Sequence, residues 1–369
     1  MRTFPDALHL AASATFSVAT RRRFLSCLWE LTYRCNARCR MCSYWRNPSR
    51  PETELNLAEI TQALERLHGA GVRMINFTGG EPTLRSDLEG IVAQASDLGF
   101  WTSIVTNGST LTQDRIRRLK GSGLDNLFIS LDSPEPEKHD ASRGIPGLHQ
   151  KVMQCLQWLH EEFLTGHRTG GIFCVLTANN AEDILRVLQI AEQAGVFAIV
   201  QPYHQAKTGS DCLSPSLTDG LVDVLAKLRR QNPCILSTQS YLKGIGSFLG
   251  HQELPRCNAG AKYFSIDPFG FLHPCVDSPA VGHVLRDDLS VLRGPAATKA
   301  VAACRGCWYC FRGEADSTLN FPGYIEKVAS VSRVLRRNVT RDWKDSATWA
   351  RGAKPGSRGA VLNRQSEGS

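Results

Sequence analysis

Residues 27–42 read CLWELTYRCNARCRMC, an apolar run of strand-forming residues that leads directly into three closely spaced cysteines. These are Cys35, Cys39 and Cys42, separated by three and then two residues. Zinc sites usually combine two short pairs of ligands, whereas three thiolates in one tight loop leave a corner of the metal centre open. The run therefore indicates a reactive metal centre. A zinc site completed by a distant histidine is the alternative.

Around this run, short strand-like segments alternate with helical patterns from Trp29 to about Tyr203, as in βα units around a parallel sheet. Strands are predicted at 27–33, 72–78, 101–106, 126–131, 171–177 and 197–203. Six units predict an α/β fold with a partial, TIM-like (β/α)6 barrel, because closure takes eight. Functional residues of such barrels lie on the loops that follow the strands, and the cysteine run occupies one of them.

The pattern changes after a helix predicted near 217–228. Strand-like segments at 262–267 and 271–274 flank Pro268-Phe269-Gly270 and predict a β-hairpin in which the glycine adopts a positive φ. Five cysteines surround or follow this hairpin, and they are Cys257, Cys275, Cys304, Cys307 and Cys310. We predict four regions: an N-terminal extension (1–25), the barrel (26–235), a small metal-bearing domain (236–325), and a helix with a basic, disordered tail (326–369).

Composition excludes several classes of protein. The chain has 369 residues, 42% hydrophobic and 21% charged, as in soluble globular proteins, and no apolar run approaches the ~18 to 20 residues of a membrane span. The net charge is +8, but residues 333–369 hold nine Lys/Arg against three Asp/Glu. The remainder is nearly neutral, so no nucleic-acid partner is indicated. Peripheral contact of the basic tail with an anionic membrane surface stays open.

Cysteine usage indicates the compartment. There are thirteen cysteines, an odd number, and the start of the chain lacks the basic-then-apolar order of an export signal. Disulfide scaffolds are small secreted chains, so we expect a cytoplasmic protein whose thiolates are held by metal.

Further motifs end the next predicted strands. Thr78-Gly79-Gly80-Glu81-Pro82 follows the second strand, Thr106-Asn107-Gly108 ends the third, and Ser130-Leu131-Asp132 ends the fourth. Paired glycines let the backbone approach a ligand closely, and a carboxylate beside them can accept hydrogen bonds from an ammonium group.

Together, CNARCRMC and TGGEP resemble the radical S-adenosylmethionine (radical SAM) superfamily. His139-Asp140 and Arg143-Gly144 resemble its branch with a SPASM or twitch C-terminal extension, and the resemblance covers residues 27–205 and resumes at Cys257. It implies that Cys35, Cys39 and Cys42 hold three irons of a 4Fe-4S cluster, and that SAM chelates the fourth iron.

The resemblance also implies contacts with SAM. Met41 would lie beside the adenine, and Gly79, Gly80 and Glu81 would meet the amino group. Ser130 and Arg143 would contact the ribose and the carboxylate, Arg143 as a charge-assisted fork. Asn107 would belong to the same site.

Cys257, Gly270 and Cys275 resemble the opening of the SPASM/twitch pattern. Five cysteines are too few for the two clusters of a full SPASM domain, which implies one auxiliary 4Fe-4S cluster. The family pattern gives Cys257, Cys275, Cys304 and Cys307 as ligands, with Cys310 spare or substituting. A ferredoxin-like set with Cys304, Cys307, Cys310 and one hairpin cysteine is the alternative, and a zinc site at 304–310 is a further one.

The resemblance implies an enzyme that cleaves SAM reductively to a 5′-deoxyadenosyl radical, which abstracts hydrogen from a substrate. We expect a small molecule such as a sugar, nucleoside or lipid headgroup, an oxidoreductase or carbon-skeleton reaction, and an electron donor such as flavodoxin or ferredoxin. The auxiliary cluster would assist electron transfer or substrate binding.

Two other functions stay open. One is a maturase of a ribosomally made peptide, although the 26 residues before Cys27 are few for a leader-binding domain. The other is a non-enzymatic Fe-S or zinc scaffold.

Overall fold

A computed structural model describes residues 26–46, 53–210, 229, 234–304, 306–318, 325, 326, 329 and 332. The predicted N-terminal extension, the helix near 217–228 and most of the predicted C-terminal helix and tail lie outside these residues.

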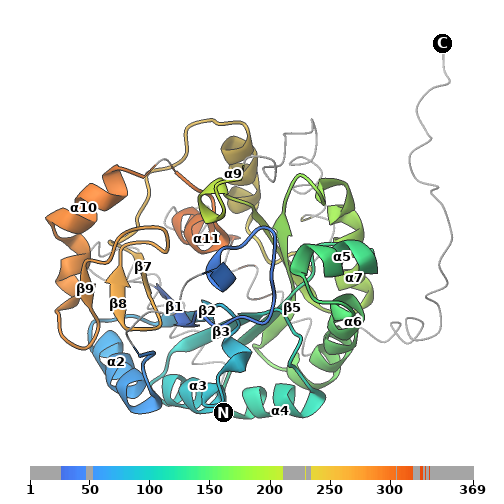
Figure 1. Ribbon diagram of the computed structural model, residues 1–369, viewed down its shortest axis with the longest axis horizontal. Coiled ribbons are helices and arrows are strands. Elements are labelled where there is room, and N and C mark those ends of the chain that lie inside the picture. Colours follow the sequence, from blue (N-terminus) through green and yellow to red (C-terminus); the bar gives the residue numbers. More distant parts are fainter. Residues whose placement is uncertain are drawn as a thin grey trace.

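A mixed sheet with the strand order β6-β5-β4-β3-β2-β1-β7-β8-β9 forms the centre of the described chain (Figure 1). Its parallel part consists of β1 (Ser26–Thr32), β2 (Met74–Gly79), β3 (Trp101–Thr106), β4 (Asn126–Ser130), β5 (Thr169–Leu176) and β6 (Phe197–Pro202). The described strands do not close into a ring, since β6 and β9 form the two edges. The predicted partial (β/α)6 barrel is confirmed.

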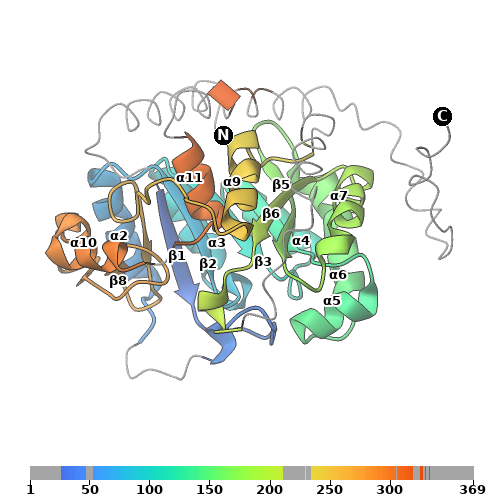
Figure 2. The same cartoon turned by 90° about the horizontal axis from the view of Figure 1, so that it is seen from above.

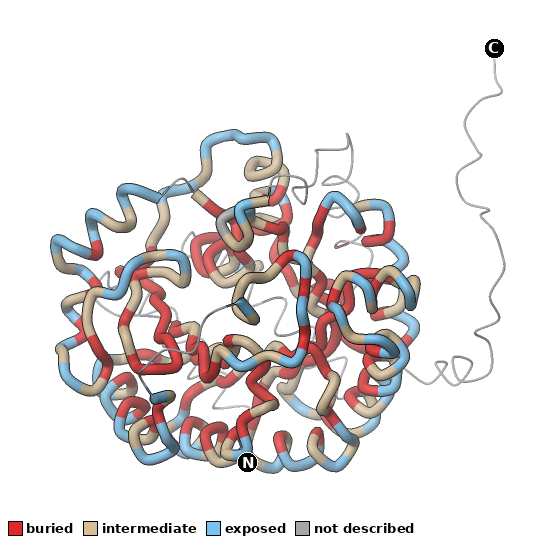
Figure 3. The backbone as a smooth tube through the Cα atoms, viewed as in Figure 1, coloured by how far each residue is buried: buried red, intermediate tan, exposed pale blue. Residues whose placement is uncertain are grey.

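Helices cover the outer side of the parallel strands (Figure 1), and the residues of the strands and of the helix faces toward them are mostly buried (Figure 3). They are α2 (Leu57–Gly69), α3 (Leu88–Asp97), α4 (Gln113–Gly121), α5 (Pro136–Arg143), α6 (Leu148–Trp158) and α7 (Ile184–Gln193). In α7 the buried residues are Ile184, Val187, Leu188 and Ala191, the spacing of one helix face. Asn56 and Glu59 form a capping box that fixes where α2 begins.

The predicted hairpin is present as β7 (Tyr263–Ile266) and β8 (Phe271–His273), and Gly270 has a φ of +89° in its turn. β7 pairs in parallel with β1, so the C-terminal region continues the barrel sheet and covers an edge that would otherwise be open. β9 (Gly282–His283), α9 (Gln239–Leu249), α10 (Pro295–Ala302) and α11 (Cys310–Thr318) complete the described elements of this region. In Figure 2, α9 and α11 stand side by side at one end of the sheet.

Within the ranges that the structure describes, no helix is long and apolar enough to cross a bilayer.

Two glycines allow the chain after β1 to pass directly over the end of β2. A Cβ on Gly79, whose φ is +125°, would lie 2.3 Å from the carbonyl oxygen of Thr32. A Cβ on Gly80 would lie 2.3 Å from the carbonyl oxygen of Arg34. Backbone hydrogen bonds replace side-chain contacts here, with Gly80 N donating to Thr32 O at 2.6 Å and Glu81 N to Arg34 O at 2.8 Å. The position of the cysteine run therefore depends on these glycines.

Gly80→Ala should destabilise the protein by about 1 to 3 kcal/mol, the usual cost of overpacking, and should lower the iron bound after reconstitution, because Arg34 must move away from β2. Thermal unfolding and iron analysis check both effects. Gly121→Ala is the matched control, since a Cβ there meets nothing within 4 Å. Equal iron content and equal melting temperature in the Gly80 variant and the native protein would contradict this account of the turn.

Candidate functional site

The loop after β1 brings the three predicted cysteines together. Cys39 is buried, whereas Cys35 and Cys42 are half-buried. All three thiols pack in one small group with Ala37, Met41 and Tyr203. Burial raises the pKa of the Cys35 thiol to about 12, and the neighbouring carboxylate of Glu81 and the other two thiols act in the same direction. Metal binding would require these thiols to lose their protons, which a cation bound beside them would favour.

The C-terminal end of α5 accepts hydrogen bonds from the backbone of this loop. Arg38 N donates to Arg143 O at 2.9 Å, and Arg40 N donates to Ser142 O at 3.0 Å. These carbonyls belong to the last turn of α5, where a helix has no internal donors left for them. The loop that carries the cysteines therefore satisfies the helix end, and the helix end fixes the loop.

Arg143 is buried between Asp132 and the cysteine loop. Its Nε and Nη2 both lie 2.6 Å from Asp132 Oδ2, and its Nη1 lies 3.9 Å from Cys39 Sγ. Burial alone would lower the pKa of Arg143, but Asp132 and Cys39 raise it, so the guanidinium stays charged. The resemblance implies a fork toward the SAM carboxylate. In the structure the Nε–Nη2 edge is occupied by Asp132, and Nη1 faces a cysteine.

Glu81 links the loops after β2 and β3. Its Oε1 accepts from the backbone N and the hydroxyl of Thr83, at 3.1 and 2.6 Å, and from the hydroxyl of Thr106 at 2.6 Å. Its Oε2 accepts from Asn107 N at 2.7 Å. The Asn107 side chain in turn donates to Asn36 in the cysteine loop at 2.9 Å. The predicted site residues Glu81 and Asn107 thus tie three loops together.

Two further predicted residues lie at this end of the barrel. Met41 is buried within the cysteine group, and Ser130 is buried at the last position of β4.

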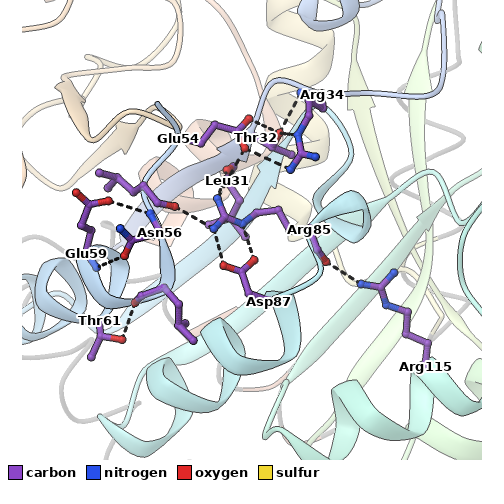
Figure 4. Close-up of polar contacts among 12 residues, drawn as sticks. Leu31, Thr32, Arg34, Glu54, Asn56, Glu59, Thr61, Arg85, Asp87 and Arg115 are labelled. Carbon is purple, nitrogen blue, oxygen red and sulfur yellow. Dashed lines mark hydrogen bonds and ion pairs between the residues drawn. The ribbon is translucent and has the colours of Figure 1, made fainter. Parts of the chain in front are cut away.

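A buried arginine that sequence reasoning missed holds the end of β1 in place (Figure 4). Arg85 donates to the carbonyl oxygens of Leu31 at 3.0 Å and Leu55 at 2.9 Å. It is oriented by Asp87, whose two oxygens lie 2.8 and 2.7 Å from Arg85 Nε and Nη2. Hydrogen bonding to Arg85 lowers the pKa of Asp87. In the sequence, the only sign of this role was that Arg85 is a charged residue five positions after the Gly79-Gly80 turn.

Polar side chains also lie between the two sets of cysteines. Glu30 of β1 is buried and accepts a hydrogen bond from Tyr44, which follows the cysteine run. Lys207 pairs with Asp277 at 2.8 Å, and its ammonium lies over the rings of Tyr44 and Tyr309. Burial raises the pKa of Glu30, while Lys207 and Tyr44 oppose the rise. A glutamate inside an apolar strand was the sequence signal for this group.

The five C-terminal cysteines do not behave alike. Cys257 and Cys275 pack in one group with Ala259, Tyr263 and Ala315. Burial, together with the charges of neighbouring thiols, raises the pKa of Cys275 to about 12 and that of Cys307 to about 11. Those neighbours are Cys307 and Cys257 for Cys275, and Cys257 for Cys307. Cys257, Cys275 and Cys307 therefore lie within electrostatic reach of one another.

The other two cysteines lie differently. Cys304 is exposed, and Cys310 packs against the main barrel core, with its backbone N donating to Gln201 at 2.9 Å.

The chemistry of the donor sets suits an iron-sulfur cluster. In the part of the chain that the structure describes, no three His, Cys, Asp or Glu side chains converge on one point, as a lone zinc ion requires. A 4Fe-4S cluster takes one thiolate on each iron, so its ligands lie further apart. The thiol-rich donor sets, with a buried arginine beside Cys39, suit that anionic group.

Comparison with known proteins identifies the family that this part of the chain resembles. Residues 29–191 match the model of the Radical SAM superfamily, a range that contains the three-cysteine loop, the Gly79–Glu81 turn and Arg143.

Two relatives and one solved structure illustrate the similarity. AdoMet-dependent heme synthase of Methanosarcina barkeri is 24% identical over 279 residues, which are 70% of this chain and 78% of that protein. PqqA peptide cyclase of Bradyrhizobium diazoefficiens is 35% identical over 137 residues, 37% of this chain and 36% of that protein. Streptococcus suis SuiB, bound to its precursor peptide SuiA, shares the fold with a TM-score of 0.59 and 15% identity, covering 83% of this chain and 73% of that one.

The motifs, the loop geometry and the superfamily match lead to one conclusion. Residues 29–191 of this chain match the radical SAM superfamily, whose members use a 4Fe-4S cluster and SAM.

Proposed function

We propose that this protein is a radical SAM enzyme that modifies a peptide. The observation that carries the substrate class is the 35% identity with PqqA peptide cyclase, and the likeness in fold to SuiB, solved with a precursor peptide, is compatible with it. These comparisons support the peptide maturase better than the sugar, nucleoside or lipid headgroup expected from the sequence.

The chain's own residues have distinct parts in this proposal. Cys35, Cys39 and Cys42 hold the cluster, and Met41, Gly79, Gly80, Glu81, Asn107, Ser130 and Arg143 form the wall of the SAM site. When bound, the two cofactors supply one-electron cleavage of SAM and hydrogen abstraction from the substrate. A low-potential donor such as flavodoxin or ferredoxin provides the electron.

The C-terminal cysteines hold an auxiliary 4Fe-4S cluster in this proposal. Cys257, Cys275 and Cys307 are within electrostatic reach of one another, which supports the set that Cys304 completes. The packing of Cys310 against the barrel core argues against the ferredoxin-like set.

The polar group between the two cysteine sets supports an amide-rich substrate. Glu30, Lys207 and Asp277 can exchange their present partners for the N–H and C=O groups of a peptide backbone. A flat apolar substrate would offer these groups no hydrogen-bonding partners in exchange.

A tetrapyrrole is the second candidate substrate. The similarity to AdoMet-dependent heme synthase extends over 70% of this chain, more than the similarity to the peptide cyclase. Lys207 would then pair with an anionic substituent of the ring.

Replacing Cys35, Cys39 or Cys42 singly by Ala should abolish SAM cleavage, because each thiolate carries one iron. Production of 5′-deoxyadenosine by reduced, reconstituted protein is the measurement. Cys27→Ala, on the strand that leads into this loop but buried in the main core, is the matched control and should keep the activity. Activity retained in any one of the three loop variants contradicts the assignment.

Glu81→Gln should cost about 1 to 3 kcal/mol of stability, because its new NH₂ group faces a donor where the carboxylate accepted a hydrogen bond. SAM affinity should fall roughly ten- to a hundredfold as the loops after β2 and β3 shift, with the iron content preserved. Denaturant unfolding, equilibrium dialysis and iron analysis measure the three quantities. Glu89→Gln, on the outer helix α3, is the control. A lower SAM affinity with unchanged stability would show that Glu81 contacts SAM and does not link the loops.

The substrate class is tested by deuterium transfer. The reduced holoenzyme is incubated with SAM and either a perdeuterated pool of synthetic peptides or a deuterated porphyrin with propionate side chains. Deuterium should enter 5′-deoxyadenosine from the peptide pool. Transfer from the porphyrin alone would replace the peptide with the second candidate.

A further inference from the structure

A second buried arginine stands beside the C-terminal cysteines. Arg312 of α11 is 4% exposed, and its Nη1 donates to Cys307 O at 2.6 Å and lies 3.9 Å from Cys307 Sγ. Its Nη2 donates to Pro255 O at 2.7 Å, in the segment that leads to Cys257. The charge of Arg312 acts on the thiols of both Cys257 and Cys307. One guanidinium thus contacts one of the proposed cluster ligands, Cys307, and acts electrostatically on a second, Cys257.

Asp316 orients this arginine from one helical turn away. Its Oδ2 accepts from Arg312 Nε at 3.2 Å and from the hydroxyl of Tyr263 at 3.3 Å, while its Oδ1 accepts from Asn258 at 3.0 Å. The Tyr263 hydroxyl also lies 3.2 Å from Cys257 Sγ. Asp316 therefore accepts hydrogen bonds from two side chains, Arg312 and Tyr263, that each lie beside a cysteine sulfur.

The same arrangement occurs at the first cysteine set. Arg143 is held by Asp132 and places Nη1 at 3.9 Å from Cys39 Sγ, as Arg312 does toward Cys307. The two pairs come from unrelated parts of the chain, since Asp132 follows β4 whereas Arg312 and Asp316 share α11. A purely structural ion pair needs no contact with a sulfur. The approach to sulfur at both places is an additional feature.

We propose that Arg312, held by Asp316, is a cationic positioning residue that stabilises the reduced form of the auxiliary cluster through the thiolates of Cys307 and Cys257. Reduction adds one negative charge to a group that is already anionic. Hydrogen bonds to sulfur and a nearby positive charge favour that added electron and raise the reduction potential. The inference rests on the auxiliary cluster of the proposed function.

The experiment uses the full chain with Cys35, Cys39 and Cys42 all replaced by Ala, so that only the auxiliary cluster is present. After anaerobic reconstitution, iron analysis comes first, and about four irons per chain are expected. Potentiometric titration followed by EPR then gives the midpoint potential of the cluster in this parent protein and in its Arg312→Gln and Arg312→Lys variants. Arg286→Gln is the matched control, because it removes an exposed charge from the same region.

We expect Arg312→Gln to shift the reduction equilibrium at least tenfold toward the oxidised form, which is 59 mV for a one-electron couple. Arg312→Lys keeps the positive charge but loses the several N–H donors of the guanidinium. Its midpoint potential should therefore lie between those of the parent and of Arg312→Gln. Arg286→Gln should match the parent. If the Gln variant fails to bind iron, the Lys variant decides: a lower potential supports the proposal and an unchanged one overturns it.

The experiment distinguishes failure of the proposed role of Arg312 from absence of the auxiliary cluster. An Arg312→Gln variant with full iron and the parent's potential overturns the role of Arg312 and leaves the cluster standing. A parent protein without iron removes the auxiliary cluster itself, and with it this inference.

Discussion

Close backbone contact between the chain after β1 and the ends of its neighbours is the constraint on which the rest of the site depends. Thr32 and Arg34 accept hydrogen bonds from Gly80 and Glu81 without any side chain between them. On the other side, the last turn of α5 accepts the N–H groups of Arg38 and Arg40. A loop held from both sides can present three thiols in a fixed arrangement before any metal arrives, which lowers the cost of ordering them.

Two buried arginines place positive charge beside the cysteines. Thiolates and iron-sulfur clusters bring negative charge into a buried region, and uncompensated buried charge is expensive. Arg143 with Asp132, and Arg312 with Asp316, place cations at the two cysteine sets. Each aspartate fixes the direction of its arginine, so these pairs act through orientation as well as charge.

The sequence predicted the barrel, the hairpin and the three-cysteine loop because each depends on local pattern. Strand-forming runs, a Gly at a positive φ and the spacing of Cys35, Cys39 and Cys42 can all be recognised without knowing the fold. The partners of Arg143 and Glu81 could not be predicted, because they depend on which loops meet at the end of the sheet. Arg312 and Asp316 show the spacing of a helical ion pair in the sequence, but nothing local indicates that a sulfur lies beside them. The pairing of β7 with β1 likewise depends on which edge the barrel leaves open.

Binding of SAM to a cluster on the Cys35–Cys42 loop is the central claim, and electron-nuclear double resonance on the reduced holoenzyme tests it most directly. SAM labelled with ¹⁵N in its amino group and ¹⁷O in its carboxylate is added to the protein. The account predicts hyperfine coupling of both labels to the reduced cluster, which Cys42→Ala removes. A cluster signal that is unchanged by labelled SAM would contradict it.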